Sequence, residues 1–113
     1  MSSPLTTHVL DTAHGVPAAG MAVRLARKDG QRWTTIAERT TNADGRVPDL
    51  LAPGALTGGR WRLRFDVEGY FAKHGQDSFF PEAELVFEVT DLTRHHHVPL
   101  LVSPFSYSTY RGS

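Results

Sequence analysis

The side chains of this sequence best suited to chemistry near neutral pH are its six histidines. Three are consecutive near the carboxyl end, His95, His96 and His97, and another, His8, follows two threonines near the amino end. Because the pKa of imidazole lies near neutrality, a histidine pair can give and take protons at working pH. If the first and last strands are neighbours, His8 and His97 form such an acid/base pair. Spacing alone leaves open the alternative that both are solvated surface side chains.

The histidine run also raises the possibility of a metal site, since imidazole is the commonest protein ligand for zinc or copper. Consecutive strand residues face opposite ways, so only His95 and His97 can converge, and a third ligand must come from His8 or elsewhere. The chain has no cysteine, which excludes disulfides, thiolate nucleophiles and thiolate metal sites. A metal-binding β-sandwich is therefore the weaker alternative.

A further candidate is Arg46, which directly follows the turn residues Asp44 and Gly45. An arginine beside a turn is usually just solvated. Its functional interpretation is a fixed guanidinium, whose planar fork of donors suits a carbonyl or carboxylate of a ligand. The sequence contains no G-x-S-x-G elbow, P-loop or dinucleotide fingerprint, which disfavours α/β-hydrolases, kinases and dehydrogenases.

Length and composition indicate one globular domain over residues 1–113, with 40% hydrophobic and 21% charged residues. Twelve basic and twelve acidic side chains cancel, so we expect no nucleic-acid or anionic membrane partner. No apolar stretch approaches the roughly 20 residues of a membrane-spanning helix. The start of the chain does not have the charge and apolar pattern of a secretory signal, and we expect a cytoplasmic protein.

The elements that must position these residues are mostly strands, because apolar and polar residues alternate along much of the chain. The strands are expected at 5–10, 21–27, 32–41, 60–67, 81–90, 95–102 and 105–113, with a short extended piece at 46–48. Asp29 and Gly30 predict a hairpin, and Gly69 and Gly75 bound a short helix. The pattern predicts an all-β, two-sheet antiparallel β-sandwich of seven to eight strands with one short helix near residues 69–75.

Two details of the side-chain pattern matter for the core. Trp33 and Ile36 cannot share a face of their strand unless a bulge intervenes, and the sequence leaves this unresolved. Val98, Leu100 and Val102 share one parity and should face the core, which turns His95 and His97 away from it. The large aromatic side chains are expected in the core rather than in a ligand site: Trp33, Trp61, Phe65 and Phe87.

Three parts of the sequence together resemble the hydrolase branch of the transthyretin family, which acts in purine catabolism. They are residues 5–11 (LTTHVLD) with 15–18 (GVPA), residues 43–46 (ADGR), and residues 97–101 (HVPLL), 103–104 (SP) and 107–113 (YSTYRGS). The resemblance extends from residue 5 to 113. Its most specific mark is the ending 110–113 (YRGS), which the hormone carriers of the same family lack.

The resemblance implies a homotetramer, a dimer of dimers, with active sites at the dimer–dimer interface along a central channel. It implies hydrolysis of the cyclic amide of 5-hydroxyisourate, the product of urate oxidation, to 2-oxo-4-hydroxy-4-carboxy-5-ureidoimidazoline. Nothing in it requires a metal or another cofactor, and we predict none. The alternative within the family is a non-catalytic carrier of a small aromatic molecule.

By the same resemblance, seven residues form the site. The catalytic group is His8, Arg46, His97 and Ser113, and the substrate-binding group is Tyr110, Arg111 and Gly112. We expect one of the two histidines to act as general base, Arg46 to orient the substrate and stabilise negative charge, and Ser113 to orient a histidine or the water. His96 occupies a position that is often aromatic in the family and should face inward, whereas His95 shares the parity of His97.

Overall fold

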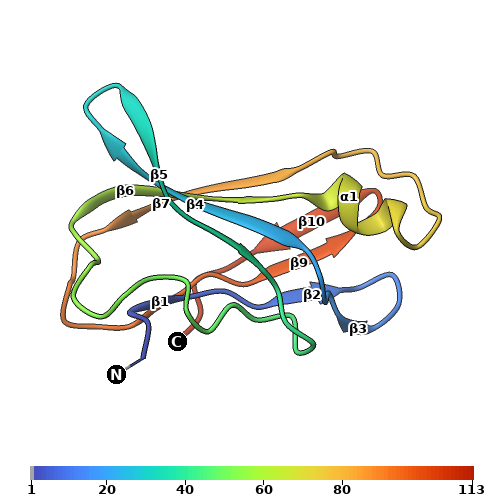
Figure 1. Ribbon diagram of the computed structural model, residues 1–113, viewed down its shortest axis with the longest axis horizontal. Helices are drawn as coiled ribbons and strands as arrows, with labels where there is room; N and C mark the ends of the chain where they lie inside the picture. Colours follow the sequence, from blue (N-terminus) through green and yellow to red (C-terminus); the bar gives the residue numbers. More distant parts are fainter. Residues whose placement is uncertain (1) are drawn as a thin grey trace.

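The computed structural model describes residues 2–113 as two layers of β-strands with one short helix at one end (Figure 1). In chain order the elements are β1 (Leu5–Thr6), β2 (Val9–Asp11), β3 (Val16–Pro17), β4 (Ala22–Asp29), β5 (Arg32–Thr40), β6 (Gly59–Phe65), α1 (Val67–Ala72), β7 (Ala83–Val89), β8 (His96–His97), β9 (Leu100–Ser103) and β10 (Ser106–Thr109). The predicted fold class, an all-β sandwich with one short helix, is confirmed. The structure has more strands than expected. The first predicted strand is divided into β1 and β2, the stretch after residue 95 is divided into β8 and β9, and β3 is an additional short strand.

The first layer is an antiparallel sheet with the strand order β5-β4-β6-β7. Alternation is clearest in β6, where Trp61, Leu63 and Phe65 are fully buried while the arginines between them reach the surface. β7 pairs with β6 in register from Gly59 opposite Val89 to Phe65 opposite Ala83. This layer supplies Leu25, Trp61, Leu63 and Phe65 to the core.

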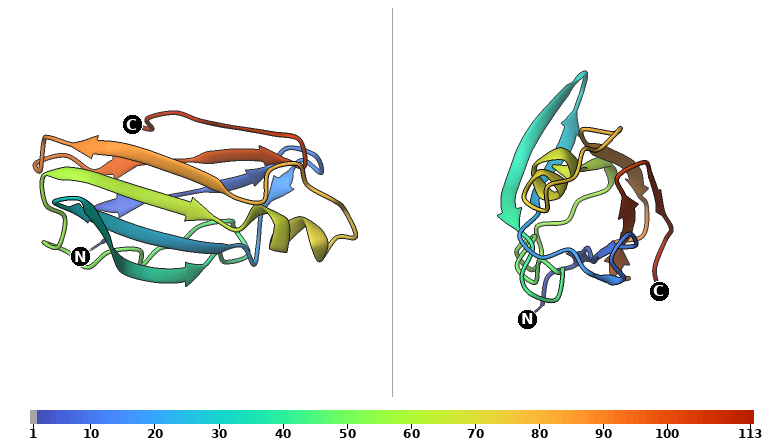
Figure 2. Two further views of the ribbon diagram at one scale, coloured as in Figure 1. Left: turned by 90° about the horizontal axis from the view of Figure 1, so that it is seen from above. Right: turned by 90° about the vertical axis from the view of Figure 1, so that its right-hand side faces the viewer.

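The second layer contains the termini and differs from the expected antiparallel arrangement. β1 pairs in parallel with β8, and β2 in parallel with β9, both at the same offset of 91 residues. Backbone bonds from Val98 to Thr6 and from Leu100 to His8 join the two pairings into one ladder. Both segments run the same way because the intervening chain crosses through the other layer. The ladder is interrupted near Pro99, which has no N–H to donate. Figure 2 shows the two layers facing each other.

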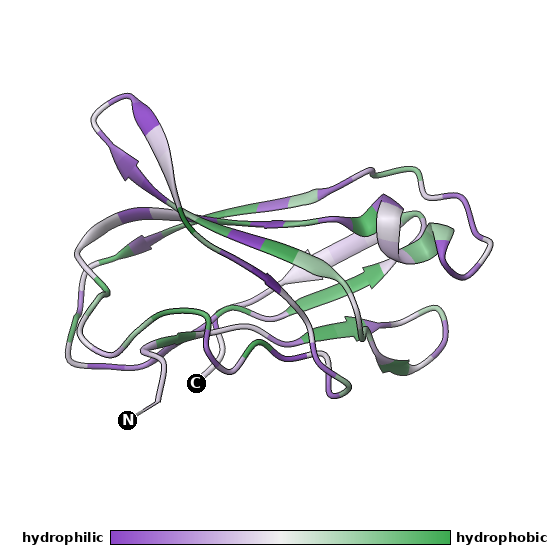
Figure 3. Cartoon of the chain, viewed as in Figure 1, coloured by the Kyte–Doolittle hydropathy of each residue, from purple (hydrophilic) through white to green (hydrophobic). Residues whose placement is uncertain are grey.

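The hairpin of β4 and β5 resolves the conflict between Trp33 and Ile36. A register shift follows Leu25, so that Leu25 pairs with Ala37 and Ala26 with Thr35, leaving Ile36 as the extra, bulged residue. The expectation that Trp33 lies in the core is wrong, because this end of the hairpin projects beyond the other layer and is polar (Figures 1 and 3). Trp33 instead lies beneath the Arg62 guanidinium, 4.7 Å from the ring centroid.

The helix begins earlier than its two glycines suggested. Asp66 is its N-cap and accepts a hydrogen bond from the Gly69 amide at 3.1 Å, so the chain turns at Val67 rather than continuing as a strand. Gly69 therefore lies inside the first turn. After Ala72 the chain continues as a turn to Gly75, whose positive φ of 69° ends it. The sequence signal for this start is Asp66 with Glu68 in the first turn.

The core lies between the layers, where helix side chains also contribute. Its largest fully buried members are Trp61, Phe65, Phe71, Leu5, Met21, Leu25, Leu50, Leu63 and Leu100. Phe87 is only half-buried and packs against this core. In the part of the chain that the structure describes, no helix is long and apolar enough to cross a membrane. The last strand ends at Thr109, so residues 110–113 are an extension rather than the strand end that was expected.

Candidate active site

His8 and Arg46 lie next to each other because a glycine turn docks on β2. They form an isolated antiparallel bridge, supported by the Val9 amide donating to the Gly45 carbonyl at 2.8 Å. Gly45 has φ 74°, and a Cβ there would collide with the Val9 carbonyl oxygen, so only glycine permits this approach. Asn42 closes the turn, because its Oδ1 accepts a hydrogen bond from the Arg46 amide at 3.0 Å. The turn thus carries the exposed Arg46 to the half-buried His8.

His97 is brought to the same face by the parallel ladder. Thr6 is its direct partner, which makes His8, two residues further along the chain, a diagonal neighbour of His97. The alternation of buried and half-buried residues places His96 on the core side and His97 on the outer side, as the sequence pattern predicted. His8, Arg46 and His97 therefore gather on the outer face of the second layer.

The imidazole of His97 is held by two contacts. Its Nδ1 lies 2.8 Å from the hydroxyl of Thr6, and the Gly112 amide donates to the His97 carbonyl at 2.8 Å. Gly112 packs so closely on the ring that a Cβ would lie 2.5 Å from Cδ2 of His97. Within residues 2–113 no hydrogen bond engages Nε2 of His97. This is the ring nitrogen available to a ligand.

Electrostatics favour a neutral imidazole at this position. Burial, followed by the charge of Arg46, lowers the pKa of His97 below its ordinary 6.5, and His95 and His8 add to the decrease. A neutral imidazole accepts a proton readily. No described acidic side chain pairs with Arg46, so its guanidinium is available to a ligand.

The carboxyl-terminal residues differ in how closely they approach His97. Gly112 is buried against it, whereas Ser113 is exposed, with no hydrogen bond to another described side chain. Tyr110 and Arg111 line a cavity of about 230 Å³ beside His97, whose other lining residues are Leu85, Val86, Phe87, Glu88, His96, Val98 and Thr109. Tyr110 is 60% exposed. The structure thus brings the tail to the site but leaves Ser113 free of the histidines.

His96 faces inward and is 5% exposed, as its parity predicted. Burial, followed by the charge of Arg111, lowers its pKa, and the Arg94 backbone opposes this weakly. Neither ring nitrogen forms a hydrogen bond of ordinary geometry. His96 therefore points away from His95 and His97, and no three His, Asp or Glu side chains among residues 2–113 gather as metal ligands do.

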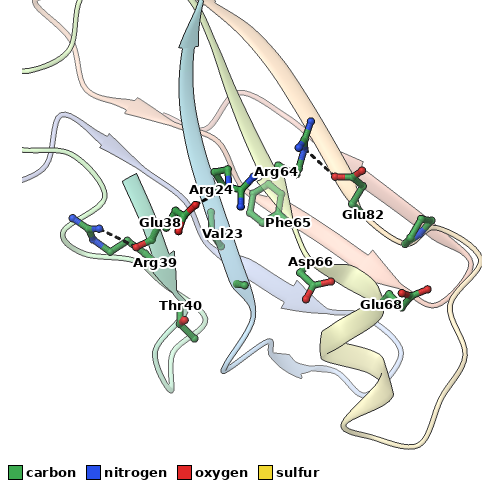
Figure 4. A pocket seen from close by; sticks show the side chains of 12 residues that line it. Val23, Arg24, Glu38, Arg39, Thr40, Arg64, Phe65, Asp66, Glu68 and Glu82 are labelled. Atoms are coloured by element: carbon green, nitrogen blue, oxygen red, sulfur yellow. Dashed lines mark hydrogen bonds and ion pairs between the residues drawn. The ribbon is translucent and has the colours of Figure 1, made fainter. Parts of the chain in front are cut away.

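A larger hollow, about 540 Å³, lies elsewhere, on the first layer beside α1 (Figure 4). Its charged side chains already pair with each other: Arg24 with Glu38 at 3.1 Å, and Arg64 with Glu82 at 2.9 Å. It contains no histidine. Volume alone would favour this hollow, but its arginines are already neutralised, and the unpaired groups around His97 make the smaller site the better candidate.

Comparison with known proteins identifies the family of the chain. The model of the HIUase/Transthyretin family matches residues 5–112. The chain belongs to this family. The resemblance seen in the sequence is therefore confirmed over nearly the whole length.

Within the HIUase/Transthyretin family the chain is similar to both branches. The 5-hydroxyisourate hydrolase of Mus musculus is 53% identical over 99% of this chain and 97% of its own length. The structure of Klebsiella pneumoniae 5-hydroxyisourate hydrolase superposes with a TM-score of 0.84 at 38% identity, covering 96% of this chain and 92% of that one. Sea bream transthyretin, solved in complex with thyroxine, gives a TM-score of 0.92 at 34% identity, covering 96% and 94%. The fold is thus shared, while sequence identity is higher to the hydrolases.

One polar residue of the site was missed by the sequence analysis. Thr6 contacts both outward-facing histidines of the run, with its Oγ1 2.8 Å from Nε2 of His95 and 2.8 Å from Nδ1 of His97. The only available signal was that Thr6 shares the parity of His8. Without the register of the ladder, nothing placed it opposite His97.

Proposed function

We propose that this protein is an enzyme that hydrolyses 5-hydroxyisourate, cleaving its cyclic amide C–N bond to give 2-oxo-4-hydroxy-4-carboxy-5-ureidoimidazoline. The observation that carries the proposal is the grouping of His8, Arg46 and His97 on one face of a family member that is 53% identical to a 5-hydroxyisourate hydrolase. An amide resists water because water is a weak nucleophile and nitrogen a poor leaving group. The site must therefore supply proton transfer and charge stabilisation.

His97 is the proposed general base. Its Nδ1 is engaged by Thr6, which leaves Nε2 to take the proton of the attacking water, and its lowered pKa keeps the ring unprotonated, and so able to accept a proton, at neutral pH. The protonated ring then serves as the acid for the leaving nitrogen. His8, the diagonal neighbour, is proposed to help orient the water or substrate.

Arg46 is proposed to bind the substrate and stabilise its oxyanion. As water adds to the carbonyl carbon, negative charge develops on the oxygen, and an unpaired guanidinium at a fixed position stabilises this charge. The bridge of Arg46 to His8 supports such a fixed position. Tyr110, Arg111 and Gly112 are proposed to line the substrate site, and Ser113 to orient the water through its hydroxyl or the terminal carboxylate.

The carrier function is the second candidate, because the fold of sea bream transthyretin matches this chain so well. A carrier needs mainly an apolar site that fits its ligand. The groups that favour hydrolysis are a neutral histidine with a free Nε2 beside an unpaired arginine. These have no necessary role in holding an aromatic ligand.

We further propose that the enzyme is a homotetramer, a dimer of dimers, with its sites at the dimer–dimer interface. Support comes from the face that bears His8 and His97, where Leu10 and Leu101 are only half-buried in the single chain. β7 and β10 are the edge strands of the two layers, and unpaired edges are suited to pairing with another copy. A second subunit against this face would shield the site from bulk water and strengthen its electrostatic interactions.

The test is to generate 5-hydroxyisourate in place with urate oxidase and follow its absorbance decay with purified protein. The wild type should accelerate the decay, and His97→Asn and Arg46→Glu should each reduce kcat/KM by about 10²-fold or more, the size of a lost general base or charge stabiliser. Circular dichroism should show that both variants remain folded. Unchanged decay with the wild type would refute the proposal.

Matched controls use the same substitutions at exposed positions away from the site. His74→Asn and Arg32→Glu, in the turn after α1 and at the hairpin tip, should keep wild-type rates. Addition of a chelator should leave the wild-type rate unchanged, whereas a metal-dependent reaction would lose it. If His97→Asn is as active as His74→Asn, the assignment of His97 as base is wrong.

A further inference from the structure

We propose that Thr6 and His95 form a proton relay that connects His97 with solvent, running from Nδ1 of His97 through Oγ1 of Thr6 to Nε2 of His95. The inference rests on the proposed function, since it takes His97 to be the group that exchanges protons with the substrate. It assigns Thr6 and His95 as positioning residues that act through His97 rather than touching the substrate.

The geometry of the three groups is that of a continuous hydrogen-bonded chain. The hydroxyl oxygen of Thr6 lies 2.8 Å from each of the two imidazole nitrogens. A hydroxyl has one proton to donate and can also accept, so in a relay it donates to one ring and accepts from the other. The tautomers of His95 and His97 are then coupled. If one ring nitrogen donates its proton to Oγ1 of Thr6, the nitrogen of the other ring must be unprotonated and accept the hydroxyl proton.

The chain also runs from a sheltered position to an open one. His97 is half-buried and Thr6 is half-buried, whereas His95 is exposed. The parallel ladder holds this arrangement, because Thr6 is the direct partner of His97 in the sheet. An exposed imidazole exchanges protons with water freely, so His95 is suited to be the outer end.

Proton movement along this chain is balanced at every atom. Nε2 of His97 takes a proton from the attacking water, and the proton on Nδ1 passes to Oγ1 of Thr6. The hydroxyl proton of Thr6 moves to Nε2 of His95, and Nδ1 of His95 releases its proton to solvent. His97 is then neutral with a proton on Nε2. The reverse transfer returns a proton to Nδ1, and the protonated ring gives its Nε2 proton to the leaving nitrogen.

The charges around His97 favour outward transfer. The groups that face it are Arg46, His8 and His95, and burial together with the Arg46 charge disfavours a proton remaining on it, which lowers its pKa. A positive charge on the exposed His95 is instead solvated by water. The relay thus moves a positive charge from His97, where burial and Arg46 disfavour it, to His95, where water solvates it.

The alternative is that Thr6 and His95 merely hold the His97 ring in position. Two substitutions separate the alternatives. Thr6→Val keeps the shape of the side chain but removes the hydroxyl, whereas His95→Gln keeps a hydrogen-bonding group near Thr6 but cannot carry a proton. If Thr6 and His95 only hold the ring, activity requires the Thr6 hydroxyl but tolerates Gln at position 95. If they form a relay, activity requires both the Thr6 hydroxyl and the His95 imidazole.

We expect kcat to fall about tenfold in Thr6→Val and in His95→Gln with KM little changed, a part of the 10²–10⁴-fold that acid–base catalysis supplies. Thr6→Ser should restore most of the rate. Added imidazole buffer should rescue His95→Gln, since an external base can take the proton, but not Thr6→Val. The matched control is Thr12→Val, which removes a hydroxyl bonded to the Val102 carbonyl at 3.1 Å and touches no histidine. A wild-type kcat in either Thr6→Val or His95→Gln overturns the relay.

A measurement without substrate separates failure of the relay from failure of the proposed function. Nitrogen-15 NMR of the histidine rings in the full-length protein reports their tautomers. In the wild type the rings of His95 and His97 should be complementary at Thr6, one nitrogen protonated and the other not, and in Thr6→Val this relation should be lost. Tautomers that are not complementary in the wild type refute the relay even if the enzyme is active; complementary tautomers in a protein that does not hydrolyse 5-hydroxyisourate refute only the proposed function.

Discussion

At the residue scale, the site depends on how one imidazole is held. Thr6 engages Nδ1 of His97 on one edge of the ring, and Gly112 packs against Cδ2 on another. Together they leave Nε2 as the nitrogen that can meet a substrate. The close approach of Gly112 gives the third residue of the terminal tetrapeptide a physical role, because a side chain there would occupy the space of the ring.

Gly112→Ala is therefore expected to displace His97. The added Cβ would lie 2.5 Å from Cδ2 and 3.0 Å from Cγ, so either the ring rotates away from Thr6 or the tail lifts from the sheet. A misplacement of about 1 Å in a catalytic group can cost on the order of 10²-fold in rate. The measurement is kcat/KM with 5-hydroxyisourate, with Gly58→Ala as the control, because Gly58 has no positive φ and an added Cβ there would make only ordinary van der Waals contact. Wild-type activity in Gly112→Ala would show that the tail does not position this ring.

At the element scale, a buried carboxylate joins the second layer to the helix. Asp11 at the end of β2 is fully buried and accepts a bond from the Tyr70 hydroxyl at 2.8 Å and from Nδ1 of His14 at 2.7 Å. Burial alone would raise the pKa of Asp11, but the hydrogen bonds from His14 and Tyr70 outweigh it and lower the pKa. Burial and the nearby carboxylate raise the pKa of Tyr70. His14 is exposed, but it also completes this bond network.

Tyr70→Phe should weaken this link. The variant keeps the ring packed but removes a hydrogen bond to a buried charge, which contributes about 1.5–3 kcal/mol. The free energy of unfolding, measured in urea at pH 7.5, should fall by that amount. Tyr107→Phe, at an exposed tyrosine with no hydroxyl bond in the described structure, should change it by less than about 0.5 kcal/mol. An equal effect of both variants would contradict the role of Asp11.

At the scale of the whole molecule, His96 makes stability depend on pH. Its ring lies inside the sandwich without a hydrogen-bond partner, and its pKa is lowered first by burial and then by Arg111. The folded protein thus binds a proton at His96 less readily than the unfolded chain, whose pKa is near 6.5. As pH falls below about 6.5, the unfolded state gains protons that the folded state does not, and stability decreases. The lowered pKa of His97 acts in the same direction.

His96→Phe should remove much of this acid sensitivity. Replacing a buried, unsatisfied imidazole by an apolar ring of similar size removes a cost of about 1–3 kcal/mol, so the variant should be more stable at neutral pH. The gain should be larger at pH 5.5 than at pH 7.5. The measurement is urea unfolding at both values and one protein concentration, since assembly also contributes to stability. His74→Phe is the control, and a pH dependence of His96→Phe equal to that of the wild type would contradict the prediction.

The sequence by itself determined the layers and the membership of most of the site. Alternation of apolar and polar residues indicates which side of a strand is buried. The strands β6 and β7 and the inward orientation of the His96 side chain were therefore predictable from the local pattern. The family motifs supplied His8, Arg46, His97 and the tail. The helix start and the bulge at Ile36 lay within a few residues of where the pattern pointed, but depended on a cap and a register shift.

Only the tertiary structure decided which residues meet across the sheet. The parallel ladder pairs residues that are 91 positions apart, and this register places Thr6 opposite His97 and within reach of His95. A shift of one residue would turn every side chain of the segment to the other face, so the register is set by the burial of the whole strand in the core. The local sequence does not determine this register, because the free energy that favours it is summed over contacts between distant parts of the chain.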